Sequence, residues 1–196
     1  MTVAGLLLAA GEGRRLGRPK ALVEVAGTRL VDTGVRLLAD GGCAPVVVVL
    51  GAAVTDVPGA RVVLNPDWAS GMASSLRVGL AALAEEVDAV VIALVDQPLV
   101  GAESVRRLRE AYRGGAVAAV ASYAGRPRNP ALLARPVWPE VTALAEGDTG
   151  ARAWMRAHPD QVTDVPCDGT GSPDDIDTAE DLATLTRPRG SRDRAP

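Results

Sequence analysis

The feature that most constrains the fold is an apolar segment near the start of the chain that runs directly into a glycine-rich loop. Val3–Leu8 contains no polar side chain, and Gly11, Gly13 and Gly17 follow it. An apolar run of this length, followed by glycines, predicts a buried strand that leads into a tight loop. Because glycine has no Cβ, backbone N–H groups in such a loop can approach an anion closely.

The same loop carries four basic side chains, Arg14, Arg15, Arg18 and Lys20. Together with the glycines, they predict a site that binds the phosphates of a nucleoside triphosphate and supports chemistry on them. The alternative is an ordinary strand–loop–helix connection with arginines on the surface. The density of glycine and basic residues directly after a buried strand favours the phosphate site.

Two common glycine motifs do not fit this loop. The dinucleotide-binding pattern is G-x-G-x-x-G, whereas the spacing of Gly11, Gly13 and Gly17 has one residue too many. The P-loop pattern places lysine directly after its last glycine and a hydroxyl residue after the lysine. Here Lys20 is separated from Gly17, and Ala21 follows it. The loop is therefore a different kind of phosphate-binding loop.

Length and composition predict one soluble globular domain. The chain has 196 residues, and we expect residues 1–186 to form a single domain and residues 187–196, a polar RPRGSRDRAP segment, to be disordered. The net charge of -3 argues against nucleic acid as a partner. The two cysteines, Cys43 and Cys167, show neither metal-ligand nor disulfide spacing, which predicts a cytoplasmic protein. No apolar run is long enough for a membrane anchor.

Apolar runs and helical stretches alternate along the chain. This pattern predicts an α/β fold with a doubly wound, mostly parallel sheet. In such a fold the carboxyl ends of the strands share one rim, where ligands bind. The predicted strands are Val3–Leu8, Val46–Leu50, Arg61–Leu64, Ala89–Leu94 and Val117–Ser122, which we expect to be covered on both faces. The predicted helices are Arg29–Asp40, Ala73–Glu85, Ala102–Arg113, Asp148–Ala157 and Thr178–Leu185.

Carboxylates follow the strand Ala89–Leu94 and precede the last predicted helix. Asp96 lies just beyond the strand, where it is well placed to bind Mg²⁺ together with phosphate oxygens. The alternative is a turn aspartate before Pro98. In the acidic run before the last helix, helix capping explains some of the carboxylates. The remaining carboxylates suggest a second metal ligand, Asp177 first and Asp175 next.

Two further segments predict ligand contacts near helix N-termini. In the first, Gly71, Ser74 and Ser75 can bind a base edge or a ribose. The alternative is that Ser70 or Ser74 simply caps a helix. In the second, we expect Asp148 to cap the helix that follows it and Arg152 to face an acceptor phosphate. We expect His158 to be an exposed residue at a helix end.

The segments LAAGEGRRLGRPK, NPDWASGMASSLRVGL, DQP, GDTGAR and DIDTAEDL together resemble the MobA-like nucleotidyltransferases. They are most similar to the molybdenum cofactor cytidylyltransferase branch, and the resemblance spans Val3–Leu185. It implies a Rossmann-like, three-layer nucleotidyltransferase fold, the fold of nucleotide-diphospho-sugar transferases. It also implies Mg²⁺-dependent transfer of CMP from CTP to the phosphate of molybdopterin, with release of pyrophosphate.

The resemblance also assigns roles to individual residues. Lys20 and Arg15 would be catalytic, and Asp96 and Asp177 would bind Mg²⁺. The nucleotide-binding residues would be Leu8, Ala9, Ala10, Gly11, Gly13, Arg14, Arg15, Lys20, Asn65, Gly71, Ser74, Ser75 and Asp96. The acceptor-binding residues would be Gln97, Pro98, Asp148, Arg152 and Asp175.

Small differences within the family bear on substrate choice. The pair Ala9-Ala10 resembles the cytidylyl branch, whereas the guanylyl branch tends to carry a second glycine there. Arg128 and Asn129 depart from the glycine and histidine usual in relatives, on the acceptor side, and Ala179 replaces a common proline. The alternatives are therefore GTP as the nucleotide, another phosphate acceptor, or a cofactor chaperone that binds nucleotide without turnover. A target molybdoenzyme is a further possible partner.

Overall fold

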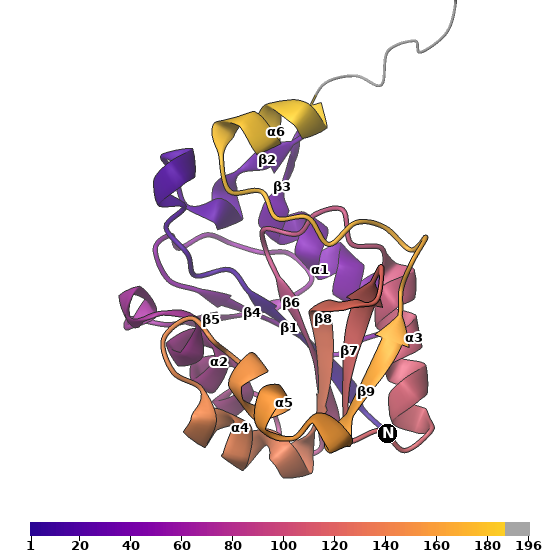
Figure 1. The fold of residues 1–196 in the computed structure, drawn as a ribbon. Coiled ribbons are helices and arrows are strands. Elements are labelled where there is room, and N and C mark those ends of the chain that lie inside the picture. Colours follow the sequence, from indigo (N-terminus) through magenta and orange to yellow (C-terminus); the bar gives the residue numbers. More distant parts are fainter. Residues whose placement is uncertain (187–196) are drawn as a thin grey trace, which may run out of the picture.

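The computed structural model describes residues 1–186 and contains one seven-stranded sheet with the strand order β5-β4-β1-β6-β8-β7-β9 (Figure 1). The expected tail, 187–196, lies outside the described residues. The strands are β1 Val3–Leu8, β4 Val46–Leu50, β5 Arg61–Leu64, β6 Ala89–Leu94, β7 Ala118–Tyr123, β8 Arg126–Ala134 and β9 Val162–Pro166. A separate two-stranded sheet pairs β2, Glu24–Val25, with β3, Thr28–Arg29.

The main sheet is mostly parallel, which confirms the predicted fold class. Strand β1 pairs in parallel with β4 and β6, β4 with β5, and β7 with β9. Strand β8 alone runs antiparallel, to both of its neighbours, β6 and β7. The carboxyl ends of β1 and β6 therefore meet at one rim, as parallel strands require.

Helices cover both faces of this sheet, in three layers (Figure 1). On β1, Leu7 belongs to the core on one face, whereas Leu6 and Leu8 belong to the core on the other. This alternation follows from the two-residue period of a strand. The first face packs against α1, Leu30–Asp40, and α3, Ala102–Arg113. The second face packs against α2 Met72–Ala81, α4 Trp138–Leu144 and α5 Arg152–Ala157.

The strand predictions were right for the apolar runs and failed elsewhere. The predicted Val117–Ser122 strand is shifted by one residue, to Ala118–Tyr123, because Val117 is exposed. Arg61–Leu64 is an edge strand whose ends are exposed, so it is not covered on both faces as expected. Strands β2, β3, β8 and β9 and helix α4 were not predicted.

Strand β8 escaped prediction because its first half reads as a loop. Pro127 and Pro130 have no N–H to donate to a neighbouring strand, and prolines argue against a central strand. Strand β6 pairs only with Ala131–Ala134 of β8. Both prolines therefore lie in the part of β8 that does not pair with β6. The register with β7 also skips Asn129 and Pro130, which form a bulge.

Two predicted helices are shorter than expected, for identifiable reasons. Helix α2 ends at Ala81 rather than Glu85, since acidic residues are unfavourable at the negative end of a helix dipole. Helix α5 begins at Arg152 rather than Asp148. The preceding Gly147 and Gly150 have φ of 51° and 52°, outside the right-handed helical region. The last helix, α6, spans Ala179–Thr186 and lies beside β2 (Figure 1).

We expect Leu7→Ala to lower the free energy of unfolding by about 2–5 kcal/mol, because Leu7 is fully buried between β1 and the helices of the first face. Urea denaturation followed by circular dichroism measures this loss. Leu64→Ala is the matched control, because Leu64 is 50% exposed, and it should change stability far less. Equal losses in the two variants would contradict the assignment of the core.

Candidate active site

The candidate site forms where the loops after β1 and β6 come together. These two strands pair in parallel along their whole length, so that Leu8 lies opposite Leu94. The glycine-rich loop that follows Leu8 and the Asp96 segment that follows Leu94 therefore emerge side by side at the carboxyl rim of the sheet. Ligands of open α/β sheets bind at this kind of rim.

Lys20 lies between the two predicted metal-binding carboxylates. Its Nζ is 2.6 Å from Oδ2 of Asp96 and 2.7 Å from Oδ1 of Asp177. Arg15 Nη2 lies 2.9 Å from the other carboxylate oxygen of Asp177. The sequence analysis gave Lys20 and Arg15 to the phosphates and the two acids to a metal. The structure brings all four side chains into one cluster, in which the positive and negative charges balance.

Partial burial makes the charges in this cluster interact strongly. The side chains of Lys20 and Asp96 are only 16% and 19% exposed. Burial alone would lower the pKa of Lys20, but attraction to Asp96 and hydrogen bonds to both carboxylates outweigh it and raise that pKa. The hydrogen bond from Lys20 lowers the pKa of Asp177, and Arg15 adds to this effect. Lys20 and Asp177 are therefore both charged at neutral pH.

The segment that carries Asp177 is held in place by residues next to Asp96. Gln97 Nε2 donates to the Pro173 carbonyl at 3.0 Å and to Oδ1 of Asp175 at 2.8 Å. The backbone N–H of Ile176 donates to the Asp96 carbonyl at 2.7 Å. Gln97 and Asp175, which the resemblance assigned to the acceptor, thus hold this segment in place.

The same segment ends in the predicted helix cap. Oδ2 of Asp181 accepts hydrogen bonds from the backbone of Asp177 at 3.0 Å and of Thr178 at 2.8 Å. Thr178 Oγ1 in turn accepts from the Asp181 backbone at 3.2 Å, as in a capping box. Capping therefore uses Asp181 and Thr178, and the side chain of Asp177 faces Lys20.

The glycines of the first loop meet two different requirements. Gly13 has φ of 63°, and a Cβ there would lie 2.2 Å from the Arg18 carbonyl oxygen, so the turn itself requires glycine. At Gly11 a Cβ would meet no atom within 4 Å. Because Gly11 also lines a cavity, its backbone leaves open space in which an anion can approach.

A cavity of about 430 Å³ extends from this loop to the N-terminus of α2. Most of the predicted nucleotide-binding residues line it, namely Leu8, Ala10, Gly11, Arg14, Lys20, Gly71, Ser75 and Asp96. Trp68, which precedes Gly71 in the same stretch of sequence, also lines the cavity. Gly13 and Arg15 line a smaller adjoining cavity of about 200 Å³ with Lys20 and Asp177. We call the larger space the nucleotide cavity.

Three predicted nucleotide-binding residues lie behind the wall of this cavity. Buried Asn65 donates through Nδ2 to Ser74 Oγ at 2.8 Å and to Ser75 Oγ at 3.0 Å. Ser74 Oγ itself donates to backbone carbonyls, and Ala9 packs into the core of the first face. Ser75, in contrast, lines the cavity, and its hydroxyl is oriented by Asn65.

Asp148 caps a helix other than the one predicted. Its Oδ1 accepts from the backbone N–H of Met72 at 3.1 Å, and the Gly147 carbonyl accepts from Ala73 at 2.8 Å. These groups satisfy free N–H groups at the start of α2, not α5. The two residues are 76 positions apart in the sequence, which explains why a local pattern could not predict the contact. It fixes the 147–152 segment against the nucleotide cavity.

His158 is also less exposed than expected. Its ring stacks on Trp154 with centroids 4.6 Å apart, and Nε2 lies 3.3 Å from Glu140. Trp154 Nε1 donates to the same carboxylate at 2.8 Å. His158 therefore joins α4 to α5, away from the phosphate cluster.

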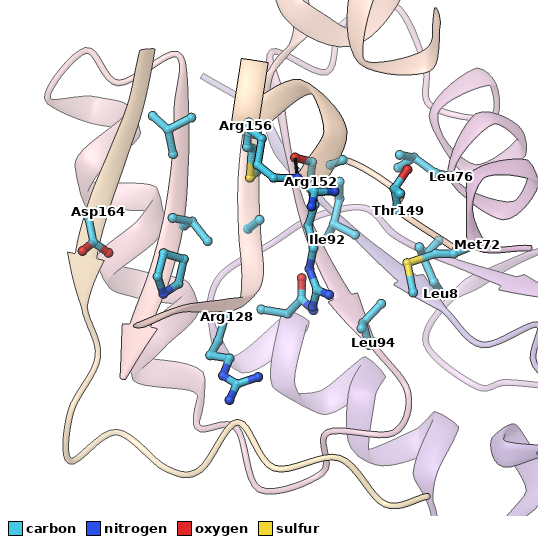
Figure 2. Close-up of a pocket in the computed structure, with 18 of the residues that line it drawn as sticks. Leu8, Met72, Leu76, Ile92, Leu94, Arg128, Thr149, Arg152, Arg156 and Asp164 are labelled. Atoms are coloured by element: carbon cyan, nitrogen blue, oxygen red, sulfur yellow. Dashed lines mark hydrogen bonds between the residues drawn. The ribbon is translucent and has the colours of Figure 1, made fainter. Parts of the chain in front are cut away.

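A second cavity, of about 390 Å³, adjoins the nucleotide cavity (Figure 2). Leu8, Met72 and Leu94 line both spaces. Arg152, predicted to face the acceptor, lines the second cavity, as does the unusual pair Arg128-Asn129. Pro98 and Asp175, in contrast, line neither space. We call the second space the arginine cavity.

Comparison with known proteins is consistent with this geometry. Residues 5–162 match the model of the MobA-like NTP transferase domain. The chain belongs to this family. It is 38% identical to a nicotine blue oxidoreductase from Paenarthrobacter nicotinovorans, over 93% of this chain and 96% of that protein. It is 31% identical to a molybdenum cofactor guanylyltransferase from Rhodobacter capsulatus, over 96% and 100%.

Solved structures of other proteins resemble this fold over nearly the whole chain. Rv0371c from Mycobacterium tuberculosis superimposes with a TM-score of 0.84 at 29% identity, covering 95% of this chain and 97% of that one. A second structure of that protein, described as a complex with manganese, has a TM-score of 0.79 at 26% identity, covering 95% and 98%. Within residues 1–186, no helix is both long and apolar enough to cross a bilayer.

We expect Lys20→Met to raise the pKa of Asp177 toward its ordinary value of 3.8, because the variant removes the hydrogen bond that lowers that pKa. A carboxyl group with a lowered pKa in the folded state stabilises the protein above its unfolded pKa, and this stabilisation is lost as the pH falls through the folded pKa. Carbon-detected NMR titration of Asp177 measures the shift. Arg18→Met, which changes another cation of the loop, is the control, and an equal shift there would contradict the pairing.

Proposed function

We propose that this protein transfers CMP from CTP to the phosphate of a molybdopterin-type acceptor and releases pyrophosphate. One observation carries the proposal. Lys20 lies between Asp96 and Asp177 beside a glycine loop, at the wall of a cavity of about 430 Å³. Membership of the MobA-like family supports nucleotidyl transfer as the reaction.

The residues present fit a divalent metal ion. Oδ1 of Asp96 is buried and has no hydrogen-bond partner among the described residues, so it is free to bind a cation. In residues 1–186 no group of three or more metal-ligating side chains comes together, which leaves two carboxylates and the substrate phosphates as ligands. Mg²⁺ characteristically binds in this way. When bound, the ion neutralises charge on the phosphates.

The side chains themselves supply positioning and charge. A phosphate oxygen of the acceptor attacks the α-phosphorus of CTP, a new P–O bond forms, and the bond to the β-phosphate bridging oxygen breaks. The departing group is pyrophosphate. A phosphate monoester is already ionised at pH 7, so the attack requires no strong base. Lys20 and Arg15 stabilise the α-phosphate and the departing pyrophosphate, and the backbone of Gly11 and Gly13 holds the phosphate chain.

Ala10 supports CTP as the nucleotide. Its methyl group lines the nucleotide cavity, and a Cβ built at Gly51 would contact both Ala10 and Trp68, so these two side chains lie close together. Side chains at this point narrow the space beside the base and favour a pyrimidine. GTP is the alternative nucleotide, because a relative in this family is a molybdenum cofactor guanylyltransferase.

A redox reaction is the second candidate function. It rests on the 38% identity with a protein named nicotine blue oxidoreductase. Two parallel assays separate the candidates. Pyrophosphate release with CTP or GTP, a divalent metal and molybdenum-loaded molybdopterin supports nucleotidyl transfer. Redox turnover of nicotine blue with an added electron donor or acceptor, without pyrophosphate release, supports the redox candidate. CTP binding with neither activity supports a chaperone.

We expect Lys20→Ala to reduce kcat/KM for pyrophosphate release by about 10²–10³, the usual effect of removing one preorganised charge-stabilising group. Loss of a single cation at the phosphates is the physical reason. Lys20→Arg should retain part of the activity, and Arg18→Ala is a matched loop control. Normal turnover by Lys20→Ala would exclude the assigned role.

We expect Ala10→Gly to shift the ratio of kcat/KM values for GTP and CTP toward GTP, because it removes the methyl group beside the base. Competition between the two nucleotides in one reaction gives this ratio directly. The buried neighbour Ala9 provides the control, since Ala9→Gly changes no atom lining the cavity. An unchanged ratio in Ala10→Gly would mean that other groups select the base.

A further inference from the structure

The arginine cavity combines an apolar surface with several positive charges. Strand residues such as Ile92 and Val120 form part of its wall, and Leu76 and Met155 contribute from helices α2 and α5. Arg128, Arg152 and Arg156 also line it. Figure 2 shows Arg152 and Arg156 in its upper part and Arg128 near the bottom, with Ile92 between them. Asp164 is the one acidic residue among the described residues that line this space.

None of these three arginines has an anionic partner among residues 1–186. Among residues 1–186, the side chains of Arg128 and Arg152 form no hydrogen bond or ion pair. Arg156 donates through Nε to the Arg152 carbonyl at 3.3 Å. Guanidinium groups bind carboxylates, phosphates and sulfonates through parallel hydrogen bonds. The cavity therefore presents unpaired positive charge beside an apolar wall.

The position of these arginines separates them from the reacting phosphates. None of the three lines the nucleotide cavity, which contains Lys20 and Asp96. The two spaces meet only at the shared residues Leu8, Met72 and Leu94. An acceptor lying across both spaces would direct its reacting phosphate toward Lys20. The arginines would then contact a different group of the same molecule.

We propose that the acceptor carries a second anionic group on a body with an apolar face, and that the arginine cavity binds this part of the molecule, with Arg128 and Arg152 supplying the positive charge. The apolar wall accommodates the body, and the arginine pair determines which acceptor is accepted. This inference rests on the proposed function in one respect only, namely that the molecule in the arginine cavity is the acceptor.

The sequence of β8 explains how this cavity arises. Pairing with β6 stops at Ala131, because the preceding residues include two prolines that cannot donate hydrogen bonds. Arg128 lies between Pro127 and Pro130, on the half of β8 that has separated from β6. The prolines thus create the opening, and Arg128 supplies a charge at its edge.

Fluorescence titration with anilinonaphthalene sulfonate tests the proposal without requiring catalysis, since this probe is a flat apolar molecule with one anionic group. N-phenylnaphthylamine has a similar body and no charge. We expect the Arg128→Gln, Arg152→Gln double variant to bind the sulfonate about tenfold more weakly, the net effect of losing one hydrogen bond to a charged group. Binding of the neutral probe should be unchanged.

Arg126→Gln is the matched control, because Arg126 begins the same strand but does not line the cavity. It should leave binding of both probes unchanged. The proposal is overturned if the parent protein does not bind the sulfonate, if the double variant binds it as tightly as the parent, or if Arg126→Gln weakens it equally. Thermal unfolding followed by circular dichroism verifies that each variant is folded.

The same variants link the cavity to the acceptor. With molybdopterin as the acceptor, the double variant should raise the KM for acceptor and leave the Kd for CTP unchanged. If no nucleotide transfer occurs in the parent, the proposed function fails, while the probe titration still decides whether the cavity selects apolar anions. A fall in kcat with unchanged acceptor KM would contradict a role in acceptor recognition.

Discussion

The arrangement of the site depends on one interaction, the pairing of Lys20 with Asp96 and Asp177. Its distances of 2.6 and 2.7 Å join three parts of the chain: the loop after β1, the residue after β6, and the segment before α6. Partly buried charges are stable only when they are paired, so each of these segments requires the others. With Arg15 on Asp177, the cluster is electrically balanced in the absence of substrate.

This balance has consequences for binding. A nucleoside triphosphate brings several negative charges, and a divalent metal brings two positive ones. When both bind, the phosphates can replace the carboxylates as partners of Lys20 and Arg15. The metal ion can then replace these two cations as the partner of the carboxylates. Binding either partner alone leaves unpaired charge in a partly buried place, which is costly. Nucleotide and metal should therefore bind cooperatively, whichever base the nucleotide carries.

Around the cluster, a set of supporting contacts fixes the geometry. Gln97 holds the Asp175 segment, Asn65 orients Ser75, and Asp148 caps α2 across a long separation in sequence. These polar residues do not all touch a ligand, yet they place the residues that line the nucleotide cavity. A site built in this way is positioned by rigid elements, which favours catalysis by orientation and charge.

The sequence by itself determined the fold class and the main residues of the site. Apolar runs such as Val3–Leu8 and Ala89–Leu94 specify parallel buried strands, because continuous apolar sequence must be covered on both faces. The glycine-rich loop predicted a phosphate site, and Asp96 was located at a strand end from its neighbours alone. The same patterns identified Lys20 and Arg15 as cations of that loop and Asp177 as a second carboxylate, and the family resemblance assigned them to one site.

Only the tertiary structure decided how these residues are shared. Lys20 pairs with both carboxylates, and Asp148 caps α2 instead of α5, through contacts between segments far apart in the chain. Strand β8 and the arginine cavity beside it could not be predicted from the sequence, because the prolines of β8 are typical of loops. They fit a strand only in the pairing that β8 makes with β6 and β7. Local sequence fixes periodicity and turn chemistry, whereas the pairing of distant charges and the shape of a cavity arise only when strands and helices pack together.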